Sequence, residues 1–242
     1  MRPEHIVTSF DEDLNRIESK ILEMGGLCES ALAKSTRALR RVDADLAREV
    51  MRVDNAINAL EAEVNDQVLI LLARRQPVAG DLRSALMTLR IAGQLERVGD
   101  YIKNMGRRTH TIASNQAFTG SVGMAIRMSE QVQAQIRQAL DAYNHRDAAL
   151  AEDVRQSDET VDQLHNSLFR ELLTYMMEDP RNISGAMQLL FIAKNIERMG
   201  DLAVDIAQEV IFMVTGAWPE DKRPKGDRTP RMVIDPDTVG YG

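Results

Sequence analysis

Apolar residues recur every three or four positions along most of the chain, which is the spacing of one face of an α-helix. The pattern is clearest between about residues 44 and 73, and it returns between about residues 147 and 177. No segment of any length alternates between apolar and polar residues as a strand would, so the pattern predicts an all-α protein. The apolar positions are Leu46, Val50, Val53, Ile57, Leu60, Val64 and Leu71 in the first stretch and Leu150, Val154, Val161, Leu164, Leu168 and Leu172 in the second.

Local start and stop signals divide this pattern into six helices. Ser9, with a glutamate three residues later, has the spacing of a capping box, and Asp43 and Asp147 each stand at the N-cap position of a later helix. Pro77 interrupts the first half of the chain, and Gly216 stops the last helix. The predicted helices span about residues 10–41, 44–73, 78–113, 122–144, 147–177 and 182–214.

The six helices fall into two sets of three, separated by a polar stretch with glycines at residues 115–123. We therefore expect two tandem three-helix bundles related by internal duplication, the first over residues 1–114 and the second over residues 124–216. Short connections favour antiparallel neighbours, and we expect the two bundles to lie end to end in an elongated molecule. Residues 217–242 are rich in proline and glycine without apolar periodicity, which predicts a disordered tail.

Composition narrows the classes of function. The net charge of −7 disfavours binding to nucleic acid, which needs clustered lysine and arginine. The single cysteine, Cys28, has no partner for a disulfide within the chain, which fits a reducing cytosol. The sequence shows neither a signal-peptide pattern nor a stretch of roughly 20 apolar residues that could span a bilayer. We therefore expect a cytoplasmic protein that does not insert directly into a membrane.

A pentapeptide that occurs twice in similar surroundings is the most distinctive local feature. Glu96–Asp100 reads Glu-Arg-Val-Gly-Asp, and 101 residues later Glu197–Asp201 reads Glu-Arg-Met-Gly-Asp. The first and last residues of each copy are four apart, so both carboxylates lie on one face of a helix. That face begins apolar, which predicts that the carboxylates lie in a groove or seam between helices. The glycine in each copy would let a neighbouring helix or a bound ion approach closely.

The preceding helix of each unit carries a matching polar stripe, so each unit can bring several oxygen or imidazole groups together. Packed carboxylates repel one another, so a positive group must lie among them. Two sources are open: Arg97 and Arg198 can form local ion pairs, or a metal ion can bind. Oxygen-rich ligand sets without cysteine favour ions such as Mg²⁺, Mn²⁺, Fe or Zn²⁺. The candidate metal ligands are Asp54, Asn58, Glu61, Glu96, Asp100 and Asn104 in the first unit and Asp158, Asp162, His165, Glu197, Asp201 and Asp205 in the second.

The sequence lacks the motifs of several known enzyme classes, including those of helical-bundle metalloenzymes. A ferritin-like di-iron bundle uses Glu-x-x-His on two helices, and neither Glu96 nor Glu197 has a histidine three residues later. There is no glycine-rich phosphate loop and no Gly-x-Ser-x-Gly elbow. We therefore predict a non-enzymatic protein. Two alternatives stay open, a metal-dependent oxidase or phosphohydrolase that uses the acidic residues, and a structural helical scaffold.

In the two pentapeptides and in the runs Arg74–Arg83 and Glu209–Gly216, the sequence resembles the PhoU family of phosphate-signalling regulators. The resemblance covers about residues 10–216 and rests on the run Arg74–Arg83, on both copies of the pentapeptide, and on the closing run Glu209–Gly216. The chain departs from the family pattern at Tyr101 and Leu202, where many members carry histidine directly after Gly-Asp.

The resemblance implies a fold of tandem three-helix bundles with multinuclear metal clusters at the acidic motifs. It implies that the chain is a negative regulator of the phosphate-starvation response and controls phosphate uptake and homeostasis through two-component signalling. It further implies an adaptor that contacts the ATPase of the phosphate-specific ABC transporter and a membrane sensor histidine kinase. Many members of the family are dimers, so the resemblance also implies a homodimer.

Overall fold

The structure of the chain is a computed structural model that describes residues 3–115, 122–157 and 159–220. Within these ranges the regular elements are all helical and no strand occurs, so the prediction of an all-α fold is confirmed. In chain order the elements are α1 (Pro3–Arg41), α2 (Ala44–Val50), α3 (Asp54–Arg75), α4 (Ala79–Asn115), α5 (Gly123–His145), α6 (Ala148–Ser157), α7 (Glu159–Glu178), the short 3-10 helix η1 (Pro180–Asn182) and α8 (Ile183–Thr215).

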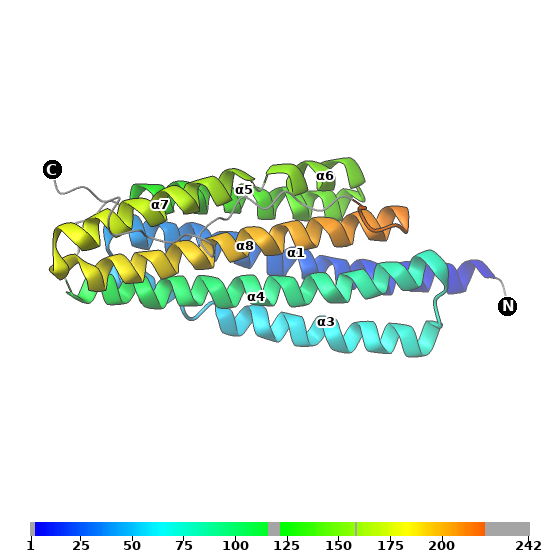
Figure 1. Cartoon of the computed structure of the whole chain (residues 1–242). Coiled ribbons are helices and arrows are strands. Elements are labelled where there is room, and N and C mark those ends of the chain that lie inside the picture. The colour runs from blue at the N-terminus through cyan, green and yellow to red at the C-terminus, as the bar shows by residue number, and fades with distance from the viewer. Residues whose placement is uncertain (1–2, 116–121, 158, 221–242) are drawn as a thin grey trace.

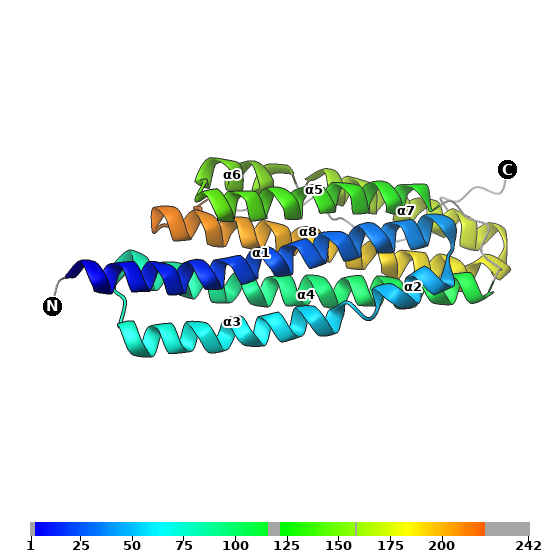
Figure 2. The same ribbon diagram turned by 180° about the vertical axis from the view of Figure 1, so that it is seen from behind.

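The two three-helix units lie side by side, and the expectation that they lie end to end is wrong. In Figure 1, α3 runs along one edge, α4 and α1 follow, then α8 and α5, with α6 and α7 along the opposite edge. The contact between the units consists of α4 against α8, which is the most extensive contact of any pair, and of α1 against α5. Figure 2 shows the same order from behind, with α1 in front of α4 and α8. Because all the long helices follow one axis, the molecule is elongated.

Two of the predicted helices each correspond to two helices in the described residues. The segment predicted as one helix over residues 44–73 forms α2 and α3, with a turn at residues 51–53. In this turn the backbone N–H groups of Arg52 and Val53 donate to carbonyls three residues earlier. The segment predicted over residues 147–177 forms α6 and α7, and Asp158 between them lies outside the described residues. Apolar periodicity continues through the turn at residues 51–53, so the pattern alone did not reveal it.

The predicted helix ends were right at three positions and wrong at one. Asp43 and Asp147 each accept hydrogen bonds from the backbone N–H groups two and three residues later, at 2.9–3.0 Å, as N-caps do. Gly216 follows α8 with a φ of 77°, which is the left-handed conformation that favours glycine. The capping box at Ser9 is wrong, because α1 already begins at Pro3 and Ser9 lies inside the helix.

The core runs through both units without interruption. Of the apolar positions predicted in the first stretch, Val50, Ile57, Val64 and Leu71 are fully buried in this core. Most of the predicted joint and tail fall outside the described residues, but Trp218, at the start of the tail, stacks on Phe212 with ring centroids 4.4 Å apart. None of the described helices is long and apolar enough to cross a membrane.

Candidate functional site

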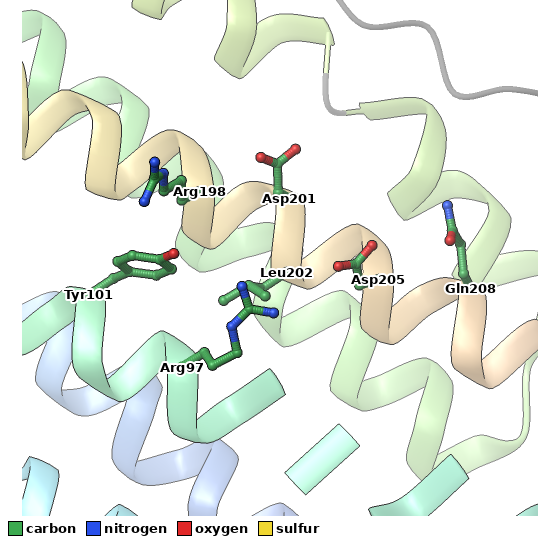
Figure 3. Close-up of a pocket in the computed structure, with 7 residues that line it drawn as sticks. All are labelled: Arg97, Tyr101, Arg198, Asp201, Leu202, Asp205 and Gln208. Carbon is green, nitrogen blue, oxygen red and sulfur yellow. The ribbon is translucent and has the colours of Figure 1, made fainter. Parts of the chain in front are cut away.

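The two copies of the pentapeptide meet at the contact between α4 and α8, where they border an open cavity of about 450 Å³. Figure 3 shows Arg97 and Tyr101 reaching this cavity from α4, with Asp205 on α8 turning its carboxylate toward Arg97. Groups of both charges therefore line the same space. We call this space the motif groove; it is lined by Arg97, Tyr101, Arg198, Asp201, Leu202, Asp205 and Gln208.

The two ends of the α4–α8 contact involve equivalent sequence positions of the two units, with the roles of the two helices reversed. Nε of Arg90 lies 3.1 Å from Oε1 of Glu209, and the guanidinium of Arg108 lies 4.2 Å from the ring centroid of Phe191. Phe191 follows Arg90 by 101 residues, and Glu209 follows Arg108 by the same 101 residues. The antiparallel helices α4 and α8 are therefore related by an approximate internal two-fold axis. Gly99 and Gly200 of the two motifs lie midway between the two contacts along each helix, so the axis passes near them.

The glycine of the first motif allows a close approach between helices. A Cβ atom at Gly99 on α4 would lie 2.9 Å from Cδ1 of Ile57 on α3. The prediction that this glycine admits a neighbouring helix is confirmed for Gly99. The approach brings the polar stripe of α3 against the acidic face of α4.

Four carboxylates from α3 and α4 gather beside this close approach. Nζ of Lys103 lies 2.6 Å from Oδ2 of the buried Asp54 and 3.9 Å from Oδ1 of Asp100, so Lys103 supplies the positive charge. The ion pair between Arg97 and Asp100, one of the two sources of positive charge left open by the sequence, does not form among the described residues, and Arg97 instead donates to Oε1 of Gln94 at 3.4 Å. We call the four carboxylates the first acidic cluster: Asp54, Glu61, Glu96 and Asp100.

Electrostatic repulsion acts within the first acidic cluster. Burial raises the pKa of the Glu96 carboxyl above its ordinary value, and the charges of the other three carboxylates raise it further, against the opposing effect of Arg97. The hydrogen bond to Asp54 raises the pKa of Lys103, so this lysine stays charged. Asn58 is exposed and Asn104 is half-buried, and within the described residues neither donates a hydrogen bond to the cluster.

The predicted ligands of the second unit that the structure describes lie on α7 and α8. Asp162 and His165 are buried on α7, which packs against α8 and α5. Glu197 is also buried, and one of its oxygens lies 2.9 Å from Nζ of Lys194. Asp201 and Asp205 line the motif groove. Asp158, the sixth predicted ligand, lies outside the described residues.

Over residues 3–115, 122–157 and 159–220, no three Asp, Glu, His or Cys side chains converge as metal ligands would. Oδ1 of the buried Asp54 has no hydrogen-bond partner in this part of the chain, which would suit a cation, but Lys103 already holds the other oxygen. A metal ion in the first acidic cluster would have to displace the Lys103 ammonium group. Metal binding at the twelve predicted positions stays a prediction.

Sequence reasoning missed the lysines that neutralise the carboxylates. Lys103 follows Asp100 by three residues and Lys194 precedes Glu197 by three, which is the spacing of a local ion pair on a helix. That spacing could have identified both. No comparable signal marks Tyr101 or Gln208, because they line the motif groove only through the packing of one unit against the other.

Comparison with known families shows where this arrangement belongs. The model of the PhoU family, described as the PhoU domain, matches residues 21–109 and again residues 125–210. The chain belongs to the PhoU family. PhoU proteins are accessory regulatory proteins and not enzymes, so the alternative of a metal-dependent oxidase or phosphohydrolase is wrong.

Individual PhoU proteins resemble the chain over nearly its whole length. A Rhizobium meliloti (strain 1021) protein named phosphate-specific transport system accessory protein PhoU homolog is 43% identical over 225 residues, which are 93% of this chain and 95% of the relative. The crystal structure of PhoU from Pseudomonas aeruginosa matches with a TM-score of 0.82 and 37% identity, over 86% of this chain and 100% of that one. The phosphate transport system regulatory protein PhoU from Streptococcus pneumoniae matches with a TM-score of 0.80 and 25% identity, over 87% and 99%.

Proposed function

We propose that this PhoU-family protein is a cytoplasmic negative regulator of the phosphate-starvation response. It acts as an adaptor between the ATPase of the phosphate-specific ABC transporter and a sensor histidine kinase. The observation that supports this most is the similarity, over 95% of the relative's length, to a protein named as an accessory protein of the phosphate-specific transport system.

The arrangement of the helices suits an adaptor. Because α1, α4, α5 and α8 make the contact between the units, they are largely occupied with holding the molecule together. The α2–α3 layer and the α6–α7 layer lie on opposite edges, where they can meet two different proteins (Figure 1). An adaptor needs two such surfaces, held at a constant separation by a rigid core.

Deletion and complementation of the gene test this function. In cells that lack the protein, a reporter of a phosphate-regulated promoter should be active even in phosphate-rich medium, and the wild-type gene should repress it again. Purification of the tagged protein from phosphate-rich cells should recover the transporter ATPase and the kinase. A reporter that responds normally to phosphate in the deletion strain would contradict the proposal.

We further propose that the predicted ligands of each unit bind metal ions, with Fe, Zn, Mn and Mg as the candidates. The orphaned oxygen of Asp54 and the mutual repulsion in the first acidic cluster support this. Elemental analysis of the purified protein should find bound metal, and less of it in the double variant Glu96→Ala, Asp100→Ala. The variant Glu130→Ala, which removes an exposed partner of Arg40, is the matched control. Equal metal content in all three proteins would remove this proposal.

We also propose a homodimer, on the basis of the family resemblance. Light scattering on the purified full chain should give twice the mass of 27.1 kDa. A monomer mass at all concentrations tested would contradict this, without affecting the proposed regulatory role.

A further inference from the structure

The outer side of α3 carries apolar residues that no other element covers. Leu69 and Ile70 are 61% and 49% exposed, while Val68 and Leu71 next to them are buried in the core. A helix at the surface ordinarily has one apolar face, so the second apolar side of α3 needs an explanation. The two N-caps Asp43 and Asp147 lie 104 residues apart, and at this spacing Ile70 corresponds to Thr174 on α7. The second unit therefore has a polar residue where the first has an exposed isoleucine.

A groove runs beside Ile70, between α3 and residues 13–17 of α1. Its volume is about 220 Å³, and the buried side chains of Ile17 and Leu71 form its floor. Arg16 from α1 and Arg74 from α3 stand at its rim. We call it the α1–α3 groove.

The charges around the α1–α3 groove have an excess of arginine. Asp13 lies 3.1 Å from Arg75 and 3.6 Å from Arg16, so its charge is already matched. Arg74 has no ion-pair partner among the described residues and is exposed. This rim is positive on a chain whose net charge is −7. At the 104-residue spacing, Arg74 corresponds to Glu178 on α7, so the second unit reverses this charge as well.

We propose that the α1–α3 groove is a docking site for an amphipathic helix of a partner protein, one that presents apolar side chains flanked by carboxylates. The apolar floor would take the apolar face, and the arginine rim would select the acidic flanks. A second copy of this chain fits less well, because two-fold pairing of the groove with itself would bring arginine rims together. The inference rests on the proposed function as an adaptor, and it names one of the two partner surfaces.

Peptide binding to the full chain tests the chemistry of the site. The probes are a fluorescently labelled synthetic helix of leucine and glutamate, and the same helix with lysine at every glutamate position. Fluorescence anisotropy should show the acidic helix binding roughly tenfold or more tightly than the basic one, with binding weakened at high ionic strength. Equal binding of the two helices would overturn the proposal.

Three variants locate the binding. Arg74→Glu introduces the residue of the second unit and should weaken the acidic helix roughly fivefold or more. Ile70→Thr, which likewise copies the second unit, should weaken it about tenfold. The matched control is Met177→Thr on α7, since Met177 is 58% exposed but lies on the opposite edge, and it should bind as the wild type does. All these residues are exposed, so the variants should fold. An unchanged affinity in both Arg74→Glu and Ile70→Thr would overturn the assignment.

Two further outcomes separate this proposal from its alternatives. If Ile70→Thr lowers the mass by light scattering, the groove is an interface between copies and the proposal fails. In the deletion strain, Ile70→Thr with Arg74→Glu should fail to repress the phosphate reporter. Full repression by that double variant, together with an active reporter in the deletion strain, would leave the regulatory function standing and remove the α1–α3 groove as its docking site.

Discussion

The two ends of the α4–α8 contact occupy equivalent positions in the internal two-fold arrangement, yet they hold different chemistry. At one end the Arg90 guanidinium lies 3.1 Å from a carboxylate oxygen of Glu209, which is only 1% exposed. At the other end the Arg108 guanidinium lies over the ring of Phe191 and donates to Gln188 at 3.1 Å. Duplication preserved the backbone geometry but not the residues: Phe191 stands at the position equivalent to Arg90, and Glu209 at the position equivalent to Arg108. An ion pair at one end is therefore replaced by a contact between an arginine and an aromatic ring at the other.

The difference gives the two ends different responses to pH. Burial raises the pKa of Glu209 to about 7, although Arg90 and Gln94 oppose the shift. Oε2 of Glu209 has no hydrogen-bond partner among the described residues, which is consistent with a poorly solvated charge. At the other end, burial and the neighbouring Arg107 lower the pKa of Arg108, but an arginine stays charged throughout the physiological range. One end of the contact should therefore titrate near neutral pH and the other should not.

Arg90→Met should have the largest effect. It leaves Glu209 buried without its ionic partner, which should cost about 3 kcal/mol of the free energy of unfolding at pH 8. At pH 5.5 Glu209 binds a proton and most of this cost should disappear. Urea unfolding at the two pH values measures it, with Arg107→Met, an exposed arginine on the same helix, as a control that should change little. An equal loss of free energy of unfolding at both pH values would show that the ion pair between Arg90 and Glu209 does not distinguish the two ends of the contact.

Glu209→Gln should remove the contribution of the Arg90–Glu209 end of the contact to the pH dependence of stability. Since the pKa is higher in the folded state than in the unfolded chain, folding binds a proton between about pH 4.5 and pH 7, and stability falls as the pH rises through that range. The loss amounts to at most about 3 kcal/mol. Urea midpoints from pH 5 to pH 8.5 should therefore slope less in the variant than in the wild type.

The single tryptophan offers a local readout of the same titration. Trp218 stacks on Phe212, and the Arg90 guanidinium lies 5.2 Å from its ring centroid. Its fluorescence should change with a midpoint near pH 7 in the wild type and stay constant in Glu209→Gln. Glu96→Gln, which changes another carboxyl with a raised pKa, should leave this signal intact. A fluorescence titration that persists in Glu209→Gln would assign the proton elsewhere.

Arg108→Met should have a smaller effect that does not depend on pH. The variant loses the contact with Phe191 and the hydrogen bond to Gln188, which should cost about 1–2 kcal/mol. Neither Phe191 nor Gln188 titrates, so the cost should be the same at pH 5.5 and pH 8.5. The neighbouring exposed Arg107→Met is the control. If the cost of Arg108→Met varied with pH as that of Arg90→Met does, the contrast between the ends would be lost.

Gly99→Ala, at the midpoint between the two ends, should have the smallest effect. Its Cβ would lie 2.9 Å from Cδ1 of Ile57, a flexible side-chain tip that can shift, and alanine favours the helix, so the net loss should be about 1 kcal/mol or less. Ile57→Val removes Cδ1, and the two substitutions together should cost less than the sum of each alone. Gly93→Ala, which has open space around it, should instead stabilise the protein. Strict additivity at positions 57 and 99 would show that the close approach is unimportant.

Much of the secondary structure could be predicted because it depends on residues close together in the sequence. Apolar residues three and four apart revealed the helices, and Asp43 and Asp147 marked two of their starts. The turn at residues 51–53 could not be predicted in the same way, because the apolar period continues through it. The candidate site was predicted in part: the acidic residues of α3 and α4 do gather, but the cation among them is Lys103 and not Arg97.

The sequence by itself determined that this protein is helical, duplicated, and acidic at two equivalent places. Helical periodicity and a repeated motif are local properties, so they can be recognised without knowing what each helix contacts. Only the tertiary structure decided that α4 lies against α8, that the motif arginines line a shared groove, and that Arg90 meets a carboxylate while Arg108 meets a ring. Those pairings join residues 80 or more apart in the chain, such as Arg108 with Gln188. An apolar stripe indicates that a helix face is buried, but it does not indicate which other helix covers that face. The partner helix is determined by the packing of the whole molecule.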